Sequence, residues 1–434
     1  MIVKFACYNR ATLEAGAKGR QTLAEDLLAA LEARLAEADR DVTAALTALA
    51  AGRGEQLYLV GGSVRDLLLG RPHVDLDIAV EGDAIALARE IAQQRQGRLT
   101  AHEKFGTASV ELAASRVDLA RTRAESYERP GALPSVRPAG IDEDLRRRDF
   151  SVNAMALRLT SPAAGELLDP HSGRRDLERR LIRVLHDGSF RDDATRMLRA
   201  VRYEARLAFR LEDETERLLR RDLSYLDTIS GARLWAELTA IFYEERLGQA
   251  LARAQELGIL TAIHPCLRLD EAGEAAIARA EEERPAPWDE VCLCLLCCHC
   301  DGQDAEALMR RLALPRRHER AIEDVVRLRG ALNDLGAADA PPSRITETLE
   351  PFSIASVWAL ALRSDDPAVA ERALLFLRQW RYVKPFLGAS ALRRLGVPAG
   401  RDLGAALRRL RAARLDGVTS SREDEIELMG RTRE

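Results

Sequence analysis

Hydrophobic positions change their spacing along the chain in a way that separates it into three stretches. From residue 23 to 51 they recur every three or four residues, which predicts helix, and glycines follow this run as a stop. Between about residues 56 and 159 short β-rich or alternating runs are separated by turn residues, with one helical run at 84–94. From about Asp169 onward helical spacing returns and strand signals are absent. The pattern predicts one α/β portion followed by an all-helical remainder, so the expected fold class is α+β.

The predicted strands and the breaks in the helical remainder give a first division of the chain. The strands are LYLV (57–60), VDLDIAV (74–80), GRLTAHE (97–103), TASVEL (107–112) and RVDLA (116–120). In the remainder, breaks fall at Pro285 and Pro287, at 336–343 and at 396–400, where Pro and Gly interrupt the helical pattern. No repeat of fixed period is evident, so we expect several helical subdomains rather than a solenoid.

Composition limits the class of protein. With 434 residues, of which 47% are hydrophobic, the chain is long enough for two to four compact units. Its net charge of -4, with 65 Lys and Arg against 69 Asp and Glu, argues against indiscriminate coating of nucleic acid, so any RNA contact must be a local patch. No apolar run approaches the roughly 18 residues that span a bilayer, and the start does not resemble a secretory signal. We therefore expect no membrane contact and a cytoplasmic address.

Five of the seven cysteines crowd into one segment, VCLCLLCCHC, between Cys292 and Cys300. In a cytoplasmic chain they predict free thiols rather than a disulfide framework. A structural metal site usually needs two separated pairs of ligands, which a single segment does not offer. The favoured interpretation is that the thiols fill a buried helix as small apolar side chains, with metal binding as the minor alternative.

A glycine pair after the first predicted strand indicates an anion-binding turn. The strand at 57–60 runs into Gly61 and Gly62, where missing side chains let the backbone approach an anion, and then into a helix that begins near Ser63. Arg65 lies on the first turn of that helix, where its guanidinium is expected to bind a phosphate oxygen.

Three aspartates on two predicted strands of one sheet predict a metal site. Asp75 and Asp77 alternate with aliphatic residues, so both carboxylates project from one face of their strand. A second strand supplies Asp118, which is again flanked by apolar residues. Paired carboxylates repel unless cations lie between them, and Mg²⁺ takes carboxylate and phosphate oxygens together. A lone Asp-X-Asp is more often a solvated strand face, but beside a phosphate-binding turn it predicts phosphoryl-transfer chemistry with two Mg²⁺ ions held by Asp75 and Asp77.

At these residues the sequence resembles the nucleotidyltransferase superfamily that includes DNA polymerase beta. It is more closely similar to the class II branch of CCA-adding enzymes and bacterial poly(A) polymerases. The family's later motifs resemble FGTA (105–108), RRDFSVNAMAL (147–157), LLDPHSGRRDLERRLIRVLHDGSF (167–190) and RDDATRMLRAVRYEARLAF (191–209). The similarity covers about residues 56–244.

The resemblance implies a division of the chain and a fold. A small mixed β-sheet nucleotidyltransferase head is followed by an elongated all-α neck, body and tail. The expected parts are an N-terminal helical extension (1–55), the head (56–160), a neck that carries the nucleotide-selecting helix (161–245), a body (246–340) and a tail that binds tRNA (341–434). A weaker similarity at 392–417 implies the tail, where Arg408, Arg409, Arg411 and Arg414 fit either a phosphate track or a solvated helix face.

Base selection follows from hydrogen-bond polarity. Cytosine and adenine each present an amino donor beside a ring-nitrogen acceptor, whereas uracil and guanine present the opposite polarity. A fixed acceptor with a fixed donor therefore accepts C and A and rejects U and G. Asp193 and Arg196, three apart on one predicted helical face, are such a pair, and the resemblance implies that they act as a protein template. The family usually has Glu-Asp where this chain has Asp192-Asp193.

Further nucleotide contacts are expected from five residues. Arg199 and Arg202 continue the helical stripe at three-residue spacing and are expected to bind the triphosphate, although such a stripe is often only a solvated face. Arg148, Asp149 and Asn153 resemble the family's second motif, which implies that they hold the sugar and phosphates.

The expected reaction is attack by the 3′-terminal ribose hydroxyl of a tRNA on the α-phosphorus of CTP or ATP, with pyrophosphate leaving. The catalytic carboxylates are expected to be Asp75, Asp77 and Asp118, and no stable protein partner is expected. Full CCA addition, partial CC or A addition and poly(A) synthesis share these motifs and stay open, as does a catalytically idle RNA-binding protein. A loop between Arg123 and Asp144 lies where the family switches from C to A. His186-Asp187 offers too few ligands for a metal site of its own.

Overall fold

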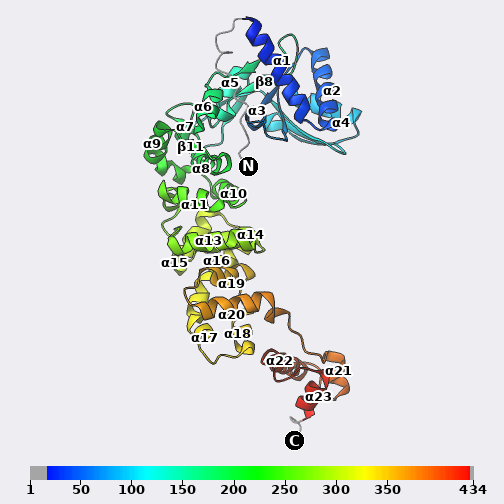
Figure 1. The fold of residues 1–434 in the computed structure, drawn as a ribbon, viewed down its shortest axis with the longest axis vertical. Coiled ribbons are helices and arrows are strands. Elements are labelled where there is room, and N and C mark those ends of the chain that lie inside the picture. Colours follow the sequence, from blue (N-terminus) through cyan, green and yellow to red (C-terminus); the bar gives the residue numbers. More distant parts are fainter. Residues whose placement is uncertain (1–16, 431–434) are drawn as a thin grey trace. The chain divides into compact units, whose positions relative to one another are not determined.

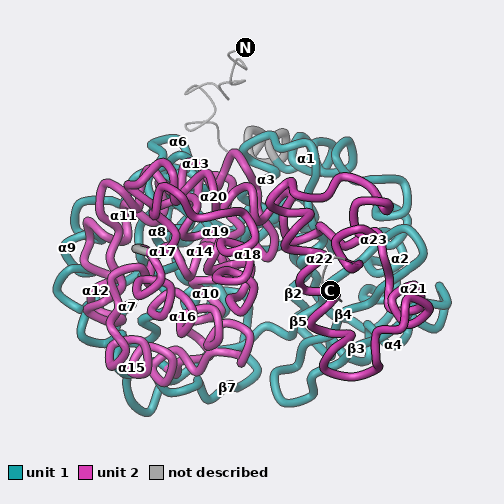
Figure 2. The backbone as a smooth tube through the Cα atoms, turned by 90° about the horizontal axis from the view of Figure 1, so that it is seen from below, with its two compact units in different colours: residues 1–229 teal, residues 230–434 magenta. Residues whose placement is uncertain are grey.

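The computed structural model describes residues 17–430, which separate into two units at Ile229 and Ser230 (Figure 2). The first unit spans residues up to 229, and the second begins at residue 230. The first 16 residues of the predicted extension and the last four of the predicted tail lie outside the described residues. No helix among residues 17–430 is both long and apolar enough to cross a bilayer.

A seven-stranded mixed sheet is the centre of the first unit (Figure 1). Its order is β3-β4-β5-β2-β1-β8-β9, in which β2 and β5 are parallel and every other neighbouring pair is antiparallel. Its strands are β1 (Gln56–Val60), β2 (Leu76–Glu81), β3 (Arg98–His102), β4 (Thr107–Glu111), β5 (Arg116–Arg121), β8 (Ala156–Arg158) and β9 (Leu167–Leu168). The five predicted strands are thus confirmed, and the two short strands β8 and β9 were not predicted.

The helices of the first unit lie around this sheet. They are α1 (Ala17–Arg34), α2 (Glu37–Arg53), α3 (Gly62–Leu68), α4 (Ala84–Gln94), α5 (Ile141–Arg146), α6 (Gly173–Arg179), α7 (Ser189–Asp192), α8 (Thr195–Leu207) and α9 (Asp213–Asp222). Helix α4 has the predicted bounds; it packs against β2 to β5 and beside α2 (Figure 1). The predicted helix at 23–51 is two helices, because the chain bends at Leu35 and Ala36, where Arg40 donates to the carbonyl oxygen of Leu35 at 3.0 Å.

Two of the predicted metal ligands, Asp77 and Asp118, lie on the face of the sheet that packs against α5. Ala79 of β2 packs with Ile141 and Leu145 of α5. Because side chains alternate along a strand, Asp77 projects from the same face as Ala79. Its neighbour in register is Asp118 on the parallel strand β5, so both carboxylates lie on that face.

Two strand pairs lie outside the main sheet. A hairpin of β6 (Arg123–Ser126) and β7 (Ser135–Pro138) occupies the region of the predicted loop. Further along, β10 (Leu181–Ile182) and β11 (Arg210–Leu211) form a parallel pair. The prediction of no strands after Asp169 was therefore wrong, because two-residue strands are too short to show any period.

The second unit is helical in all its named elements (Figure 1). Its α-helices are α10 (Gly231–Phe242), α11 (Leu247–Glu256), α12 (Ile259–Ile263), α13 (Glu271–Glu283), α14 (Trp288–Leu296), α15 (Gly302–Leu312), α16 (Arg316–Leu328), α17 (Leu332–Gly336), α18 (Pro342–Leu349), α19 (Ile354–Arg363), α20 (Pro367–Arg378), α21 (Ala389–Arg394), α22 (Arg401–Leu415) and α23 (Arg422–Gly430). Together with the sheet of the first unit this confirms the α+β class.

The cysteine-rich segment belongs to α14 and the turn after it. Cys292, Cys294 and Cys297 are buried free thiols, which confirms their prediction as apolar fillers. The prediction of free thiols throughout was wrong, because Cys300 is joined by a disulfide to Cys266. Cys266 lies in the loop that follows α12, and the spacing of the other cysteines carries no sign of this long-range contact.

Candidate active site

The Asp-X-Asp segment has the alternation that was predicted for it. Val74 and Leu76 are buried, whereas Asp75 and Asp77 reach solvent. Asp75 lies directly before β2 and Asp77 is its second residue. Ser63 at the start of α3 donates a hydrogen bond to Oδ2 of Asp77 at 3.4 Å. The carboxylates therefore lie at the point where β2 meets the glycine turn.

The carboxylates of Asp75, Asp77 and Asp118 repel one another, and the repulsion changes the pKa of Asp77. Partial desolvation raises the pKa of Asp77, and the negative charges of Asp118 and Asp75 raise it further. A hydrogen bond from Ser63 and the charge of Arg148 act in the opposite direction without cancelling the shift. Adjacent carboxylates of this kind suit a hard divalent cation, which would remove the repulsion.

The geometry fits a cation held mainly by the Asp-X-Asp pair. Asp118 is half-exposed and forms an ion pair with Arg116 at 3.4 Å. Among residues 17–430 no three His, Cys, Asp or Glu side chains are gathered closely enough to hold a metal ion by themselves. Phosphate oxygens of a bound nucleotide would supply the ligands that this protein set lacks.

The glycine turn brings Arg148 over the end of β1. Gly61 has φ 66° and ψ -127° and precedes α3. A Cβ atom at Gly61 would lie 2.7 Å from Nη1 of Arg148. The turn thus needs glycine both for its backbone conformation and for the close approach of a guanidinium.

Replacing Gly61 with Ala should destabilise the protein and reduce its activity, because the new methyl group must displace Arg148 in a backbone conformation that L-residues rarely adopt. The matched control is Gly62→Ala, whose backbone lies outside the left-handed region and whose Cβ would come no closer than 3.3 Å to Nη2 of Arg65. Thermal unfolding should show a clearly larger loss for Gly61→Ala. Equal melting temperatures for the two variants would contradict this account of the turn.

The Arg65 guanidinium is held by neighbouring side chains. It is buried and donates to Asn153 Oδ1 at 2.7 Å and to both carboxylate oxygens of Asp66 at 3.0 and 2.8 Å. Asn153 in turn donates to Asp149 at 3.0 Å. The structure thus joins three predicted nucleotide-binding residues, Arg65, Asn153 and Asp149, in one buried chain of hydrogen bonds.

Asp149 is the centre of this buried network. One carboxylate oxygen accepts from Asn153 and from the backbone N–H of Phe150, and the other accepts from Arg199 at 2.9 and 2.5 Å. Burial raises the pKa of Asp149, but the charge of Arg199 and these hydrogen bonds outweigh burial and lower it. Asp149 is therefore an ionised carboxylate that fixes one arginine of α8.

The predicted base-reading pair spans the junction between α7 and α8. Asp193 lies outside both helices, and its carboxylate accepts from the backbone N–H and the hydroxyl of Thr195 at 3.0 and 2.7 Å. The prediction of one helical face for Asp193 and Arg196 was wrong for Asp193, because its backbone is extended, with φ -144° and ψ 100°, and α8 begins only at Thr195. Arg196 lies on α8, is buried, and donates to Ser189 and to the backbone oxygen of Arg147.

Four arginines surround the ring of Tyr203 on α8. The guanidinium carbons of Arg65, Arg199, Arg202 and Arg206 lie between 5.4 and 5.9 Å from the ring centroid. The ring provides a negative face for these cations and is the point at which α3 and α8 meet. Two of these cations are also ion-paired, Arg65 with Asp66 and Arg199 with Asp149.

Sequence reasoning missed three residues of the site. Asp144 is buried and bonds both Arg147 and Arg148, Ser189 bonds Arg196, and Tyr203 contacts the arginines of α8. Asp144 follows Glu143 and Asp142 in the chain, and nothing in that run of acids distinguishes the buried one. An aromatic residue within an arginine stripe was the available signal for Tyr203.

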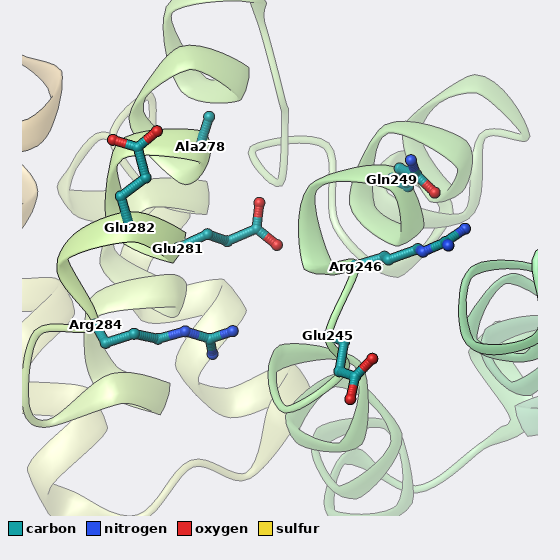
Figure 3. Close-up of a pocket in the computed structure, with 7 residues that line it drawn as sticks. All are labelled: Glu245, Arg246, Gln249, Ala278, Glu281, Glu282 and Arg284. Atoms are coloured by element: carbon teal, nitrogen blue, oxygen red, sulfur yellow. The ribbon is translucent and has the colours of Figure 1, made fainter. Parts of the chain in front are cut away.

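A cavity of about 430 Å³ lies in the second unit between α11 and α13 (Figure 3). Glu281 and Arg284 extend from the α13 side toward the α11 side, whereas the Arg246 side chain extends away from Glu281 (Figure 3). It contains none of the predicted site residues, all of which belong to the first unit.

Two family models match the chain. The Poly A polymerase head domain matches residues 57–183, which contain the sheet, the glycine turn and the three aspartates. The model described as the probable RNA and SrmB-binding site of polymerase A matches residues 208–270.

The most similar proteins include curated relatives and solved structures. An A-adding tRNA nucleotidyltransferase of Geobacter sulfurreducens is 33% identical over 395 residues, 86% of this chain and 44% of the relative. A CC-adding tRNA nucleotidyltransferase of Deinococcus radiodurans is 39% identical over 274 residues, 62% of this chain and 69% of the relative. The solved CCA-adding enzyme of Thermotoga maritima in complex with tRNA superimposes with a TM-score of 0.77 at 28% identity, covering 96% of this chain and 98% of that one.

The match differs in extent between relatives. The chain spans only 25% to 56% of the length of three A-adding relatives. It spans 69% of the CC-adding relative, which is 39% identical, and 67% and 69% of two CCA-adding relatives from Geobacillus, which are 33% and 32% identical. The sheet, the ordered motifs and these relatives show that the chain belongs to the tRNA nucleotidyltransferase family.

Proposed function

We propose that the chain adds C, A or both to the 3′ end of tRNA from CTP and ATP and releases pyrophosphate. The observation that carries the proposal is the dipeptide Arg147-Arg148, which joins the two halves of the site. The side chain of Arg148 lies over Gly61 and acts on the charge of Asp77, while the backbone oxygen of Arg147 accepts from Arg196. Arg148 thus acts through its charge on the proposed metal ligand Asp77, and the adjacent Arg147 bonds the proposed base-reading donor Arg196.

Asp75 and Asp77, with Asp118 beside them, would hold two Mg²⁺ ions, which lower the pKa of the attacking hydroxyl and neutralise the leaving pyrophosphate. This chain's own residues orient the nucleotide. Arg199 and Arg202, with Arg148 and Arg65, face the triphosphate in this proposal, and Gly61, Gly62 and Ser63 line its approach. Asp149 and Asn153 hold the arginines in place.

Selection of C and A is assigned to Asp193 and Arg196. The carboxylate accepts from the exocyclic amino group and the guanidinium donates to the ring nitrogen, so uracil and guanine leave both groups unpaired. The hairpin β6–β7 is the segment that would influence which of the two bases is added.

The tail is proposed to contact the tRNA. Arg408 and Arg409 of α22 are exposed, and a cavity of about 330 Å³ with an apolar lining lies beside Lys384 and Arg408. Arg411 and Arg414 instead hold the tail together: Arg411 forms an ion pair with Glu350 at 2.8 Å, and the Arg414 guanidinium lies over a phenylalanine ring. The proposed phosphate track therefore consists of Arg408 and Arg409 rather than of all four arginines that the sequence suggested.

The proposal assigns residues 56–160 to the head, 161–245 to the neck, 246–340 to the body and 341–434 to the tail, after an extension at 1–55, in a cytoplasmic enzyme without a stable protein partner. Relatives that add CC, A or CCA are all similar to the chain, so partial addition is the competing specificity. The family assignment gives a poly(A) polymerase or an idle RNA-binding protein less support.

The deciding experiment supplies Mg²⁺, labelled CTP and labelled ATP with tRNAs that end before CCA, after C and after CC. We expect extension by one to three nucleotides that stops at the natural end. Product lengths separate CCA, CC-only and A-only addition. Long A tails on an unstructured RNA would identify a poly(A) polymerase, and no extension of any tRNA would refute the proposed function.

A further inference from the structure

The guanidinium of Arg196 is held through both of its terminal nitrogens. Nη1 donates to the hydroxyl of Ser189 at 2.6 Å, and Nη2 donates to the backbone oxygen of Arg147 at 2.8 Å. Only 5% of Arg196 is exposed, so the protein rather than solvent determines its direction. A guanidinium with two of its nitrogens bonded in this way cannot turn about its long axis without losing a hydrogen bond.

Ser189 contacts both members of the base-reading pair. It is fully buried at the start of α7, its hydroxyl accepts from Arg196, and its backbone oxygen accepts from the N–H of Asp193 at 3.2 Å. The backbone oxygen of Asp193 in turn accepts from the N–H of Arg196 at 3.1 Å. One residue therefore fixes the distance between the acceptor and the donor that read the base.

The other contact, to Arg147, is fixed through Asp144. This carboxylate, which is 1% exposed, accepts from the Arg147 side chain at 2.7 and 3.0 Å and from Arg148 at 2.9 Å. Glu125 on β6 also accepts from Arg147, at 3.1 Å. The position of the Arg147 backbone, and with it the oxygen that Arg196 reaches, depends on these ion pairs.

We propose that Ser189 and Asp144 are positioning residues that aim the Arg196 guanidinium and thereby determine which bases the enzyme accepts. The inference rests on the proposed function and adds to it the source of its selectivity. A site built to hydrogen-bond one edge of a base rejects another base because polar groups would be left unpaired. That penalty is large only while the donor cannot turn to meet the wrong edge.

The test compares Ser189→Ala and Asp144→Asn with the unaltered chain. For each, kcat and KM are measured with CTP, ATP, UTP and GTP on the tRNA that the unaltered chain extends. We expect the ratio of kcat/KM for the accepted nucleotide over UTP and GTP to fall by about tenfold in each variant, as for one lost hydrogen bond to a charged group. The fall should appear as gained use of UTP or GTP, which a merely structural role would not produce.

Matched controls separate selectivity from stability. Ser356→Ala and Asp324→Asn remove a buried hydroxyl and a buried ion-paired carboxylate in the second unit, with 1% exposure at each residue. They should lower the melting temperature to a similar degree and leave the nucleotide ratios unchanged. In an Arg196→Ala background, Ser189→Ala should cause no further loss of selectivity.

The outcomes are distinct. Unchanged nucleotide ratios in the folded variants would overturn the inference while the proposed function stands. No incorporation of CTP or ATP by the unaltered chain would instead remove the proposed function. Because the variants act on different nitrogens of the Arg196 guanidinium, failure of one variant to fold leaves the other to decide.

Discussion

Asp77→Asn is expected to abolish nucleotide addition while leaving the protein at least as stable as before. The amide keeps the shape of the carboxylate but is a poor ligand for a hard cation, so incorporation of labelled CTP or ATP should fall by more than about a hundredfold. Stability should hold or rise because the charge of Asp77 is unfavourable in the fold. Its pKa lies above the ordinary 3.8, so ionising it as the pH rises through the folded-state value costs stability.

The matched control is Asp142→Asn, which removes an exposed carboxylate from α5. It should change neither incorporation nor the melting temperature. Turnover near the original rate in Asp77→Asn would remove Asp77 from the catalytic residues. A marked fall in its melting temperature would show that the carboxylates do not repel one another as the geometry indicates.

Asp149→Ala is expected to cause a large loss of stability. It removes a buried carboxylate that bonds Arg199, Asn153 and the backbone of Phe150. Breaking a buried ion pair by deleting one partner costs about 3 kcal/mol or more, because the remaining charge loses the group that offset its desolvation. Urea denaturation measures the difference in the free energy of unfolding.

The pH dependence gives a second test of Asp149. Its pKa lies below the ordinary 3.8, so it contributes stability above that value and loses it as the pH falls through the lower folded-state pKa. The stability gap between the unaltered chain and Asp149→Ala should therefore narrow below pH 3.8. The control Asp213→Ala removes an exposed ion pair with Arg210 and should cost less than about 1 kcal/mol. Equal costs for the two substitutions would show that the Asp149 network does not stabilise the fold.

The sequence predicted those parts of the structure that depend on local alternation. The alternation of Val74, Leu76 and Ile78 predicts a strand. It also predicts that Asp75 and Asp77 lie on the polar face, since successive side chains of a strand point to opposite faces. The bounds of α4 were predictable because its apolar residues recur at helical spacing. The pairing of the strands was not predictable. Nothing in the sequence near Asp118 specifies that β5 lies parallel to β2 and brings the carboxylates of Asp77 and Asp118 into register.

Side-chain partners in the site were less predictable than backbone elements. The sequence predicts that the Arg65 guanidinium binds a phosphate oxygen. In the structure, Asp66 and Asn153 bond this guanidinium. Asp193 has helical spacing to Arg196, yet its carboxylate bonds Thr195 and its backbone lies outside α8, which begins at Thr195. In each case a short-range hydrogen bond competes with the periodic pattern, and periodicity does not report which of them is stronger.

The ring of Tyr203 makes the arginines around it mutually dependent. Arg65, Arg199, Arg202 and Arg206 contact the same aromatic surface, so removing one lets the others move toward the space it leaves. Alanine effects at these positions will therefore not add, and a sum of single substitutions will misstate what the cluster contributes. Only double-mutant cycles that include Tyr203 can apportion the cluster's contribution to the free energy of unfolding among the four.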